Sequence, residues 1–192
     1  DVDSIQLVNR YATDTLLYNF SWIVRDSIDS YMNLNGFAMQ RDTGSFLVGI
    51  DESFFNIGRR IFRIVPGARI YKDSSRFFVE DFEIASGPQK IFVNGAISRN
   101  SNEILRVNMQ DFGLEMLNYF IGAGATRLEG NLNGNIIVTE ILQRPKFLAN
   151  VQVDSIQLNG RSMGNLDLIS DYTLKNDTIS LDANLQLGNL QT

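Results

Sequence analysis

A run of alternating side chains between residues 128 and 138 constrains the fold of this chain more than any other feature. All but one of the intervening residues are polar, and every second position is apolar or glycine: Leu128, Gly130, Leu132, Gly134, Ile136 and Val138. A period of two sends neighbouring side chains to opposite faces of a sheet. The run therefore predicts a strand with one apolar face and one hydrated face.

The same pattern returns near the C-terminus. Apolar residues there alternate with Ser180, Asp182, Asn184 and Gln186, and they are Ile179, Leu181, Ala183, Leu185 and Leu187. A sheet built from such one-sided strands has to cover its apolar face. What covers that face is therefore the main question about function.

Turn-forming residues recur at short intervals, which is typical of an all-β protein. We expect Asn159-Gly160, Asn35-Gly36 and Asn94-Gly95, among others, to form turns. The segments between the turn signals predict strands near 2–9, 13–24, 28–39, 45–50, 53–57, 61–65, 68–72, 76–85, 90–98, 103–109, 126–141, 147–158, 163–173 and 178–187. Breaks in the alternation predict bulges at Glu80-Asp81 and Asp154-Ser155.

One segment has a helical period. Leu114, Leu117 and Ile121 lie three and seven residues apart, which predicts one short helix near 112–121. We expect Asp111 to cap this helix and the glycines at 122–124 to end it. The simpler interpretation is a plug over one end of the apolar surface, and the alternative is a lid or a helix that docks a partner.

Composition excludes several classes of function. The 192-residue chain has a formal net charge of −5, which argues against binding to nucleic acid. It has no histidine and no cysteine, so Ser-His-Asp catalysis, thiol chemistry and thiolate or imidazole metal sites are excluded. No apolar run is long enough to span a bilayer.

Charged clusters offer only weak candidates for a site. Asp51-Glu52 and Glu80-Asp81-Glu83 could be paired acids of a glycosidase, but charged residues commonly occupy the wet face and turns of a sheet. Arg59, Arg60 and Arg63 form the main basic cluster. We interpret this cluster as charge protecting an edge strand, with contact to anionic lipid headgroups or an acidic partner as the alternative.

The chain shows no linker, and we expect residues 1–192 to form a single continuous unit. Because it opens on Asp and carries no signal peptide, we interpret it as a piece of a longer chain. The hexapeptide Val-Asp-Ser-Ile-Gln-Leu occurs at 2–7 and again at 153–158, which indicates internal repetition.

The apolar face has two interpretations: the interior of a self-packed sandwich or barrel, or a curved open sheet that holds acyl chains. In the second, inward glycines make room for a hydrocarbon chain. Neither requires a cofactor or a metal. The residues expected to line such a groove are Ile91, Val93, Ile97, Val107, Leu128, Gly130, Leu132, Gly134, Ile136, Val138, Val151, Val153, Ile156, Leu158, Leu166, Leu168, Ile179, Leu181, Leu185 and Leu187.

Residues 68–192 resemble the repeated β-rich domain of the TamB/AsmA-like superfamily, the translocation and assembly module of the Gram-negative envelope. The resemblance is carried by four ordered segments: 68–87, 91–98, 107–117 and 128–136, the last followed by Arg144-Pro-Lys-Phe147. The fourth segment is the most specific, since it matches the family's L-x-G-x-L-x-G strand before a Pro-Lys pair. Residues 1–67 fit the pattern less well.

The resemblance implies an all-β fold, a mostly antiparallel curved sheet that forms a taco-like groove with an apolar interior. It implies a non-enzymatic periplasmic segment that binds or conducts lipid acyl chains between the inner and outer membranes and supports outer-membrane biogenesis. The partners that the resemblance implies are phospholipid and an outer-membrane barrel of the TamA type. It also implies that the parent chain is anchored in the inner membrane and that this piece of it is soluble.

Two other hypotheses remain open at this point. One is a structural module whose edge strands pair with an outer-membrane protein or with the barrel partner. The other is a glycan-binding module that uses the aromatic-rich first half of the chain as its platform.

Overall fold

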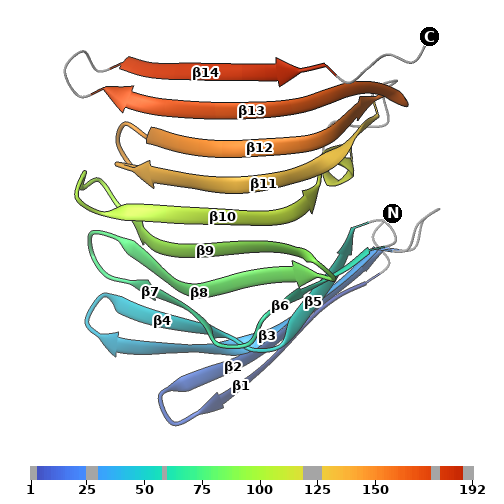
Figure 1. The fold of residues 1–192 in the computed structure, drawn as a ribbon. Helices are drawn as coiled ribbons and strands as arrows, with labels where there is room; N and C mark the ends of the chain where they lie inside the picture. Colours follow the sequence, from blue (N-terminus) through green and yellow to red (C-terminus); the bar gives the residue numbers. More distant parts are fainter. Residues whose placement is uncertain (1–3, 25–29, 58–59, 119–126, 174–177, 188–192) are drawn as a thin grey trace.

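The structure, a computed structural model, describes residues 4–24, 30–57, 60–118, 127–173 and 178–187, and it shows one sheet of 14 strands with every pairing antiparallel (Figure 1). The strands are β1 (Ser4–Ala12), β2 (Thr15–Val24), β3 (Ser30–Asp42), β4 (Ser45–Ile50), β5 (Ser53–Ile57), β6 (Arg60–Ile64), β7 (Ala68–Lys72), β8 (Phe77–Ser86), β9 (Gln89–Ile97), β10 (Ile104–Gly113), β11 (Leu128–Thr139), β12 (Lys146–Leu158), β13 (Arg161–Thr173) and β14 (Thr178–Gln186). A 3₁₀ helix, η1 (Leu114–Leu117), follows β10. The expected all-β curved fold is confirmed, and each segment predicted to be a strand is one.

The sheet is a meander in which neighbours in sequence are neighbours in space. Its main path runs from β1 to β14, with β5 and β6 beside it. β4 and β5 both pair with β3 and are separated only by Asp51 and Glu52, so they are two parts of one long strand. β6 and β7 likewise both pair with β8. The path therefore consists of long strands joined by short turns from one edge of the sheet to the other.

The pairing register assigns the alternating side chains to two faces. Leu132 of β11 lies opposite Val153 of β12, which lies opposite Leu166 of β13 and, through it, Leu185 of β14. Because residues paired across antiparallel strands share a face, the apolar side of every strand meets the apolar side of its neighbour. We call this common apolar side the inner face, and the opposite side the outer face.

The inner face is buried at its centre although no second sheet covers it in the described part of the chain. Phe62 is 4% exposed, Ile64 6%, Val79 7% and Val153 5%. Side chains on a flat single layer stay open to solvent, so this burial requires the sheet to curl its inner face toward itself. Figure 1 shows the resulting curvature, with β1 to β3 turned away from the direction of β11 to β14.

A bulge on one strand beside a glycine on the next recurs three times and bends the sheet. β8, β10 and β12 each carry a bulge at a residue with positive φ: Asp81 at 52°, Asp111 at 48° and Ser155 at 55°. A glycine with positive φ lies beside each bulge on the next strand: Gly95, Gly134 and Gly164. Bulges bend a strand and increase its twist, so repeating them on alternate strands accumulates curvature.

These observations test the predicted irregularities. The bulges expected at Glu80-Asp81 and Asp154-Ser155 are confirmed. Asp111 does not cap a helix: it is the bulge residue of β10, and its N–H donates to Oδ1 of Asn133 at 2.8 Å. The helix begins later, after Gly113, and has no side-chain cap. Residues 119–121 of the predicted helix lie outside the described part.

Two predicted turns are wrong. Asn35-Gly36 and Asn94-Gly95 lie inside β3 and β9. Glycine is required there by close approach, because a Cβ on Gly36 would lie 2.1 Å from the carbonyl oxygen of Gly49, and one on Gly95 would lie 2.1 Å from that of Ile104. Asn159-Gly160 does form the predicted two-residue turn, between β12 and β13.

The two copies of the hexapeptide have different surroundings. The copy at 153–158 lies in β12, between two neighbouring strands, and contains the bulge at Ser155. The described part of the other copy, from Ser4 to Leu7, pairs regularly with β2 at the edge of the sheet. The repetition in sequence therefore does not extend to a repetition of pairing.

We expect Gly134→Ala to unfold the sheet far more readily than a glycine change in a turn. The Cβ would lie 2.3 Å from the carbonyl oxygen of Asn150 at a φ of 149°, so the adjacent backbone must shift. The free energy of unfolding should fall by about 3 kcal/mol or more. Gly44→Ala is the control, since nothing lies within 4 Å of its Cβ and only the backbone penalty of roughly 1–2 kcal/mol applies. Equal losses in urea unfolding would contradict this explanation.

Candidate functional site

The candidate site is the inner face, because it collects the residues expected to line a groove. The register of β8 to β14 places on this one face those of them that lie within a strand and have a described side chain. The side chain of Ile179 lies outside the described part, and Leu187 follows β14 directly. The polar residues between them lie on the outer face, where Asn131, Asp182 and Asn184 are exposed.

Burial across this face falls from the centre to the edges. Val151 and Val153 are 8% and 5% exposed, whereas Leu181 and Leu185 on β14 are 64% and 44% exposed and Leu187 is 71% exposed. We expected these C-terminal residues to share the face of β11 and to be buried there. Leu181 and Leu185 lie on the expected face but are not buried, because β14 has a neighbour on one side only among the described strands. Leu187 follows the end of β14, where no pairing fixes its face.

The two inward glycines do not have the role expected of them. Both have positive φ, 143° at Gly130 and 149° at Gly134, and their Cβ positions are directed at the backbone of β12. Glycine is needed here so that β11 and β12 can approach closely, at the bulge beside Gly130 and at the regular pair of Gly134 with Val151, and not to leave space for a ligand. The apolar character of this part of the face comes from their neighbours Leu132 and Ile136.

Sequence reasoning missed the N-terminal half of the face. The register extends it across β8 to β1 through residues that include Phe20, Trp22, Phe55, Phe62 and Phe82. The rings of Phe55 and Phe62 stack at 5.5 Å between centroids. The signal was weak because apolar residues such as Leu17 and Ile23 interrupt the polar side of these strands.

One end of the inner face is covered by η1. Leu114 packs with Val151 and Val153, and Met116 is 3% exposed. Asn118 fixes the far end of the helix: its Nδ2 donates to the carbonyl of Leu128 at 2.8 Å, and its Oδ1 accepts from the N–H of the same residue at 2.9 Å. The helix is thus a plug over this end, which is the simpler of the two interpretations.

The basic cluster lies only partly at an edge. Arg63 pairs with Phe54 of β5 and Ala85 of β8 and so lies inside the sheet, whereas Arg60 pairs only with Ile57 of β5. Nη2 of Arg60 lies 2.7 Å from Oε1 of Glu115 and so joins the plug to the far side of the inner face. Both side chains are partly exposed, so this ion pair contributes roughly 0–1 kcal/mol and mainly orients the plug.

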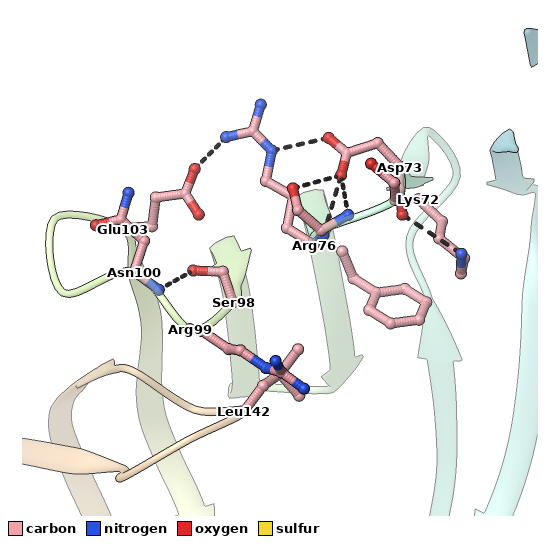
Figure 2. A pocket seen from close by; sticks show the side chains of 11 residues that line it. Lys72, Asp73, Arg76, Ser98, Arg99, Asn100, Glu103 and Leu142 are labelled. Carbon is pink, nitrogen blue, oxygen red and sulfur yellow. Dashed lines mark hydrogen bonds and ion pairs between the residues drawn. The ribbon is translucent and has the colours of Figure 1, made fainter.

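A polar cavity of about 740 Å³ lies at the other end of the strands, between the turns that join β7 to β8, β9 to β10 and β11 to β12 (Figure 2). Arg76 crosses its rim and pairs with both Asp73 and Glu103. The backbone N–H and the hydroxyl of Ser75, together with Arg76, lower the pKa of Asp73 to about 2. Arg76, Asp73 and Glu103 thus pair with one another within the rim, and we interpret this cavity as a structural junction of turns.

The acidic residues Glu80, Asp81 and Glu83 also have structural contacts or positions. Oε2 of Glu80 accepts from the hydroxyl of Tyr71 at 3.0 Å, Asp81 forms a bulge, and Oε1 of Glu83 lies 3.5 Å from Nζ of Lys90. Among the described residues, no group of three or more acidic side chains could hold a metal ion. These contacts favour the structural interpretation of the acids over the glycosidase one.

Comparisons with known proteins give no relative. No protein-family model matches the sequence. No curated protein matches it. No solved structure matches the fold. The likeness to the TamB/AsmA-like superfamily therefore stays a prediction from sequence segments. Within the described residues, no helix is both long and apolar enough to cross a membrane.

We expect Leu114→Ala to loosen the plug. The truncation leaves a cavity against Val151 and Val153 and should lower the free energy of unfolding by about 2–4 kcal/mol. Leu117→Ala in the same helix removes a side chain that is 38% exposed and should cost within about 0.5 kcal/mol. Chemical denaturation of the two variants checks the difference. Similar small losses would show that η1 does not pack on the face.

The turn at Asp73 should respond to pH only under strongly acidic conditions. A carboxyl whose pKa is lowered stabilises the folded state above its ordinary value of 3.8, and that contribution disappears as the pH falls through about 2. Carbon NMR of the carboxyl should give a midpoint near pH 2. Ser75→Ala and Arg76→Gln should each raise it, and an unchanged midpoint in both variants would contradict the assigned cause.

Proposed function

We propose that the inner face is a non-enzymatic surface that binds acyl chains of lipids. The observation that supports this most strongly is an apolar face that runs from β1 to β14 on a single curved layer, with no second sheet over it in the described part of the chain. Such a face needs an apolar partner, and hydrocarbon is a chemically suitable one. The side chains present offer aliphatic and aromatic contact and require no cofactor.

The energetics of such binding need no charged contact. Each methylene group that leaves water for an apolar surface contributes about 0.8 kcal/mol. Several methylenes lying along the central strands therefore outweigh the cost of ordering a flexible chain. Leu132 and Ile136, which are half-buried, supply aliphatic surface at the centre, and Phe55 and Phe82, also half-buried, supply aromatic surface toward the N-terminal half.

The biological setting of the proposal follows from the resemblance. We propose that the protein works in the periplasm as part of a chain anchored in the inner membrane. There the face would bind or conduct phospholipid acyl chains between the two membranes and support outer-membrane biogenesis. A barrel of the TamA type is the corresponding partner.

A second function is favoured by the edges of the sheet. β1 and β14 each offer nine residues with an unpaired backbone edge and contain no proline and no lysine. An edge of this kind is a template for β-augmentation. The alternative proposal is therefore an interaction module that pairs an edge with a strand of an outer-membrane protein or of the barrel partner.

Two adjacent residues of β12 give a matched test of the lipid proposal. Phe147 lies on the inner face and Leu148 on the outer face, and they are 43% and 40% exposed. Because both are exposed, Phe147→Asp and Leu148→Asp should both fold. An unpaired carboxylate beside a bound acyl chain is costly to desolvate, so Phe147→Asp should lower fluorescent fatty-acid uptake about tenfold or more.

The same experiment has clear contrary outcomes. Leu148→Asp should bind fatty acid as the unchanged protein does, and circular dichroism should show that both variants keep the β fold. Mass spectrometry of organic extracts should find lipid in the unchanged protein. Equal loss in both variants, or an unchanged protein that carries and takes up no lipid, would overturn the acyl-chain proposal and favour the interaction module.

A further inference from the structure

The cavity between the turns at one end of the strands is lined by more positive than negative charge. Its lining includes the cations Lys72, Arg76 and Arg99 and the anions Asp73 and Glu103. Figure 2 shows Arg76 paired with both acids, which leaves the other two cations outside this set of ion pairs. In a chain whose formal net charge is −5, such a local excess of positive charge marks a place suited to an anion.

Lys72 and Arg99 are exposed, and among the described residues neither has an acidic partner. Nζ of Lys72 donates to the carbonyl of Asp73 at 3.4 Å and lies 5.8 Å from the centre of the Phe77 ring. Within the described part of the chain, no hydrogen bond or ion pair joins Arg99 to another residue. Ammonium and guanidinium groups are the common protein contacts of carboxylate and phosphate. Both side chains can therefore bind an anion in the cavity without breaking an ion pair.

Hydrogen bonds between the turns fix the walls of this cavity. The N–H of Leu142 donates to the carbonyl of Ser98 at 3.0 Å, which joins the turn after β11 to the end of β9. The N–H of Asn100 donates to the hydroxyl of Ser98 at 3.0 Å, which holds the turn between β9 and β10. Ser98 itself is only 4% exposed. The walls are therefore in place before a ligand arrives, and such preorganisation lowers the cost of binding.

Two residues of the cavity lining belong to the inner face. By the pairing register Lys72 lies opposite Phe77, and Phe77 lies opposite Ile97 of the expected groove. Phe77 is 38% exposed and lines the cavity together with the cations. The apolar side chains of the inner face thus begin where the charged lining ends. A molecule that lies along the strands can place its apolar chain on this face and its polar end in the cavity.

The inner face between the cavity and the plug has the length of an acyl chain. Val138, beside the turn that borders the cavity, follows Leu132 by six residues in β11, and Leu132 packs against the cluster of Leu114 in the plug. At about 3.3 Å per residue the two positions are roughly 20 Å apart. This is comparable with the extended chain of a long-chain fatty acid.

We propose that this cavity binds the anionic headgroup of an amphiphile whose acyl chain lies on the inner face, with the Arg99 guanidinium and the Lys72 ammonium contacting the headgroup oxygens. The inference rests on the proposed function, since it assumes that the chain binds to that face. A carboxylate and a phosphate share the required chemistry, which is negatively charged oxygen that accepts hydrogen bonds from both cations. The far end of the acyl chain then points toward the plug.

A fatty acid and the fatty alcohol of the same chain length test this assignment, because they differ only at the polar end. In Lys72→Gln and in Arg99→Gln, affinity for a fluorescent fatty acid should fall roughly threefold to tenfold, and it should fall further in the double variant. Affinity for the matching fluorescent alcohol should stay unchanged. Lys72→Arg keeps the charge and should bind the acid as the unchanged protein does.

Arg106→Gln is the matched control for net charge. Arg106 is an exposed arginine on the outer face of β10, opposite Asn94 of β9. Its removal changes the net charge by the same amount and should leave affinity for the fatty acid unchanged. If it weakens binding as much as Arg99→Gln does, general attraction between charges explains the effect and the proposed contact is wrong.

Inorganic phosphate separates a lipid headgroup from a free anion. It carries charged oxygens but no chain, so at a concentration equal to that of the fatty acid it should not displace the acid. Phosphatidic acid carries a phosphate on acyl chains and should displace it. Displacement by inorganic phosphate at equal concentration would show a site for free anions and would overturn the assignment to a lipid headgroup.

Two spin-labelled fatty acids test the orientation. A nitroxide near the carboxyl should broaden the methyl NMR signals of Leu142 at the cavity, and a nitroxide at the far end of the chain should broaden those of Leu114 in the plug. The reverse pattern, or equal broadening of both leucines by both labels, would show that the headgroup does not lie in the cavity.

The outcomes separate this inference from the proposed function. If the unchanged protein binds neither the fatty acid nor the fatty alcohol, acyl-chain binding is wrong and the headgroup site with it. If the unchanged protein binds both, and the changes at Lys72 and Arg99 weaken neither ligand or weaken both equally, the headgroup site is wrong while acyl-chain binding stands.

Discussion

The structure depends on the need to hide one apolar face without a second layer. A one-sided sheet can pack its apolar face on helices, on another sheet or on itself by curving. The described part of this chain takes the third course. Bulges at Asp81, Asp111 and Ser155 provide the bends, and a positive-φ glycine lies beside each of them on the neighbouring strand. The glycines that first suggest space for a ligand are thus part of the mechanism of curvature.

The two ends of the inner face differ, and the difference follows from the course of β10. This strand begins after Glu103, at the cavity between three turns, two of which Arg76 joins, and it ends at Gly113, where η1 turns onto the inner face. The plug is held from both sides, because Asn118 at its end binds the backbone of Leu128 on β11 and its Glu115 pairs with Arg60 on β6. A hydrocarbon chain lying along the strands would therefore meet an apolar plug at one end and a hydrated, charged rim at the other. This asymmetry suits an amphipathic molecule.

The sequence predicted the strands well because two local signals agree. Alternation with a period of two marks each strand, and Gly, Asn, Asp and Pro mark most turns. What it could not predict depends on contacts distant in sequence. Gly36 resembles a turn residue until Gly49 and Tyr18 are placed against it, and Asp111 resembles a helix cap until Asn133 binds its N–H. The plug's tie to Arg60 joins residues far apart in the chain, so no local pattern could reveal it.

The candidate site was predicted in its C-terminal half and missed in its N-terminal half, and the physical reason bears on function. In β11 to β14 the outer face is polar, so the inner face stands out. In β2 to β8 apolar residues lie on both faces, and Leu47 of β4 is buried on the outer one. In the two proposed functions, an acyl chain would lie over the half-buried side chains of the central strands, and an added strand would join at the exposed edges. The two proposals therefore depend on one property, an inner face that continues without interruption to both edges.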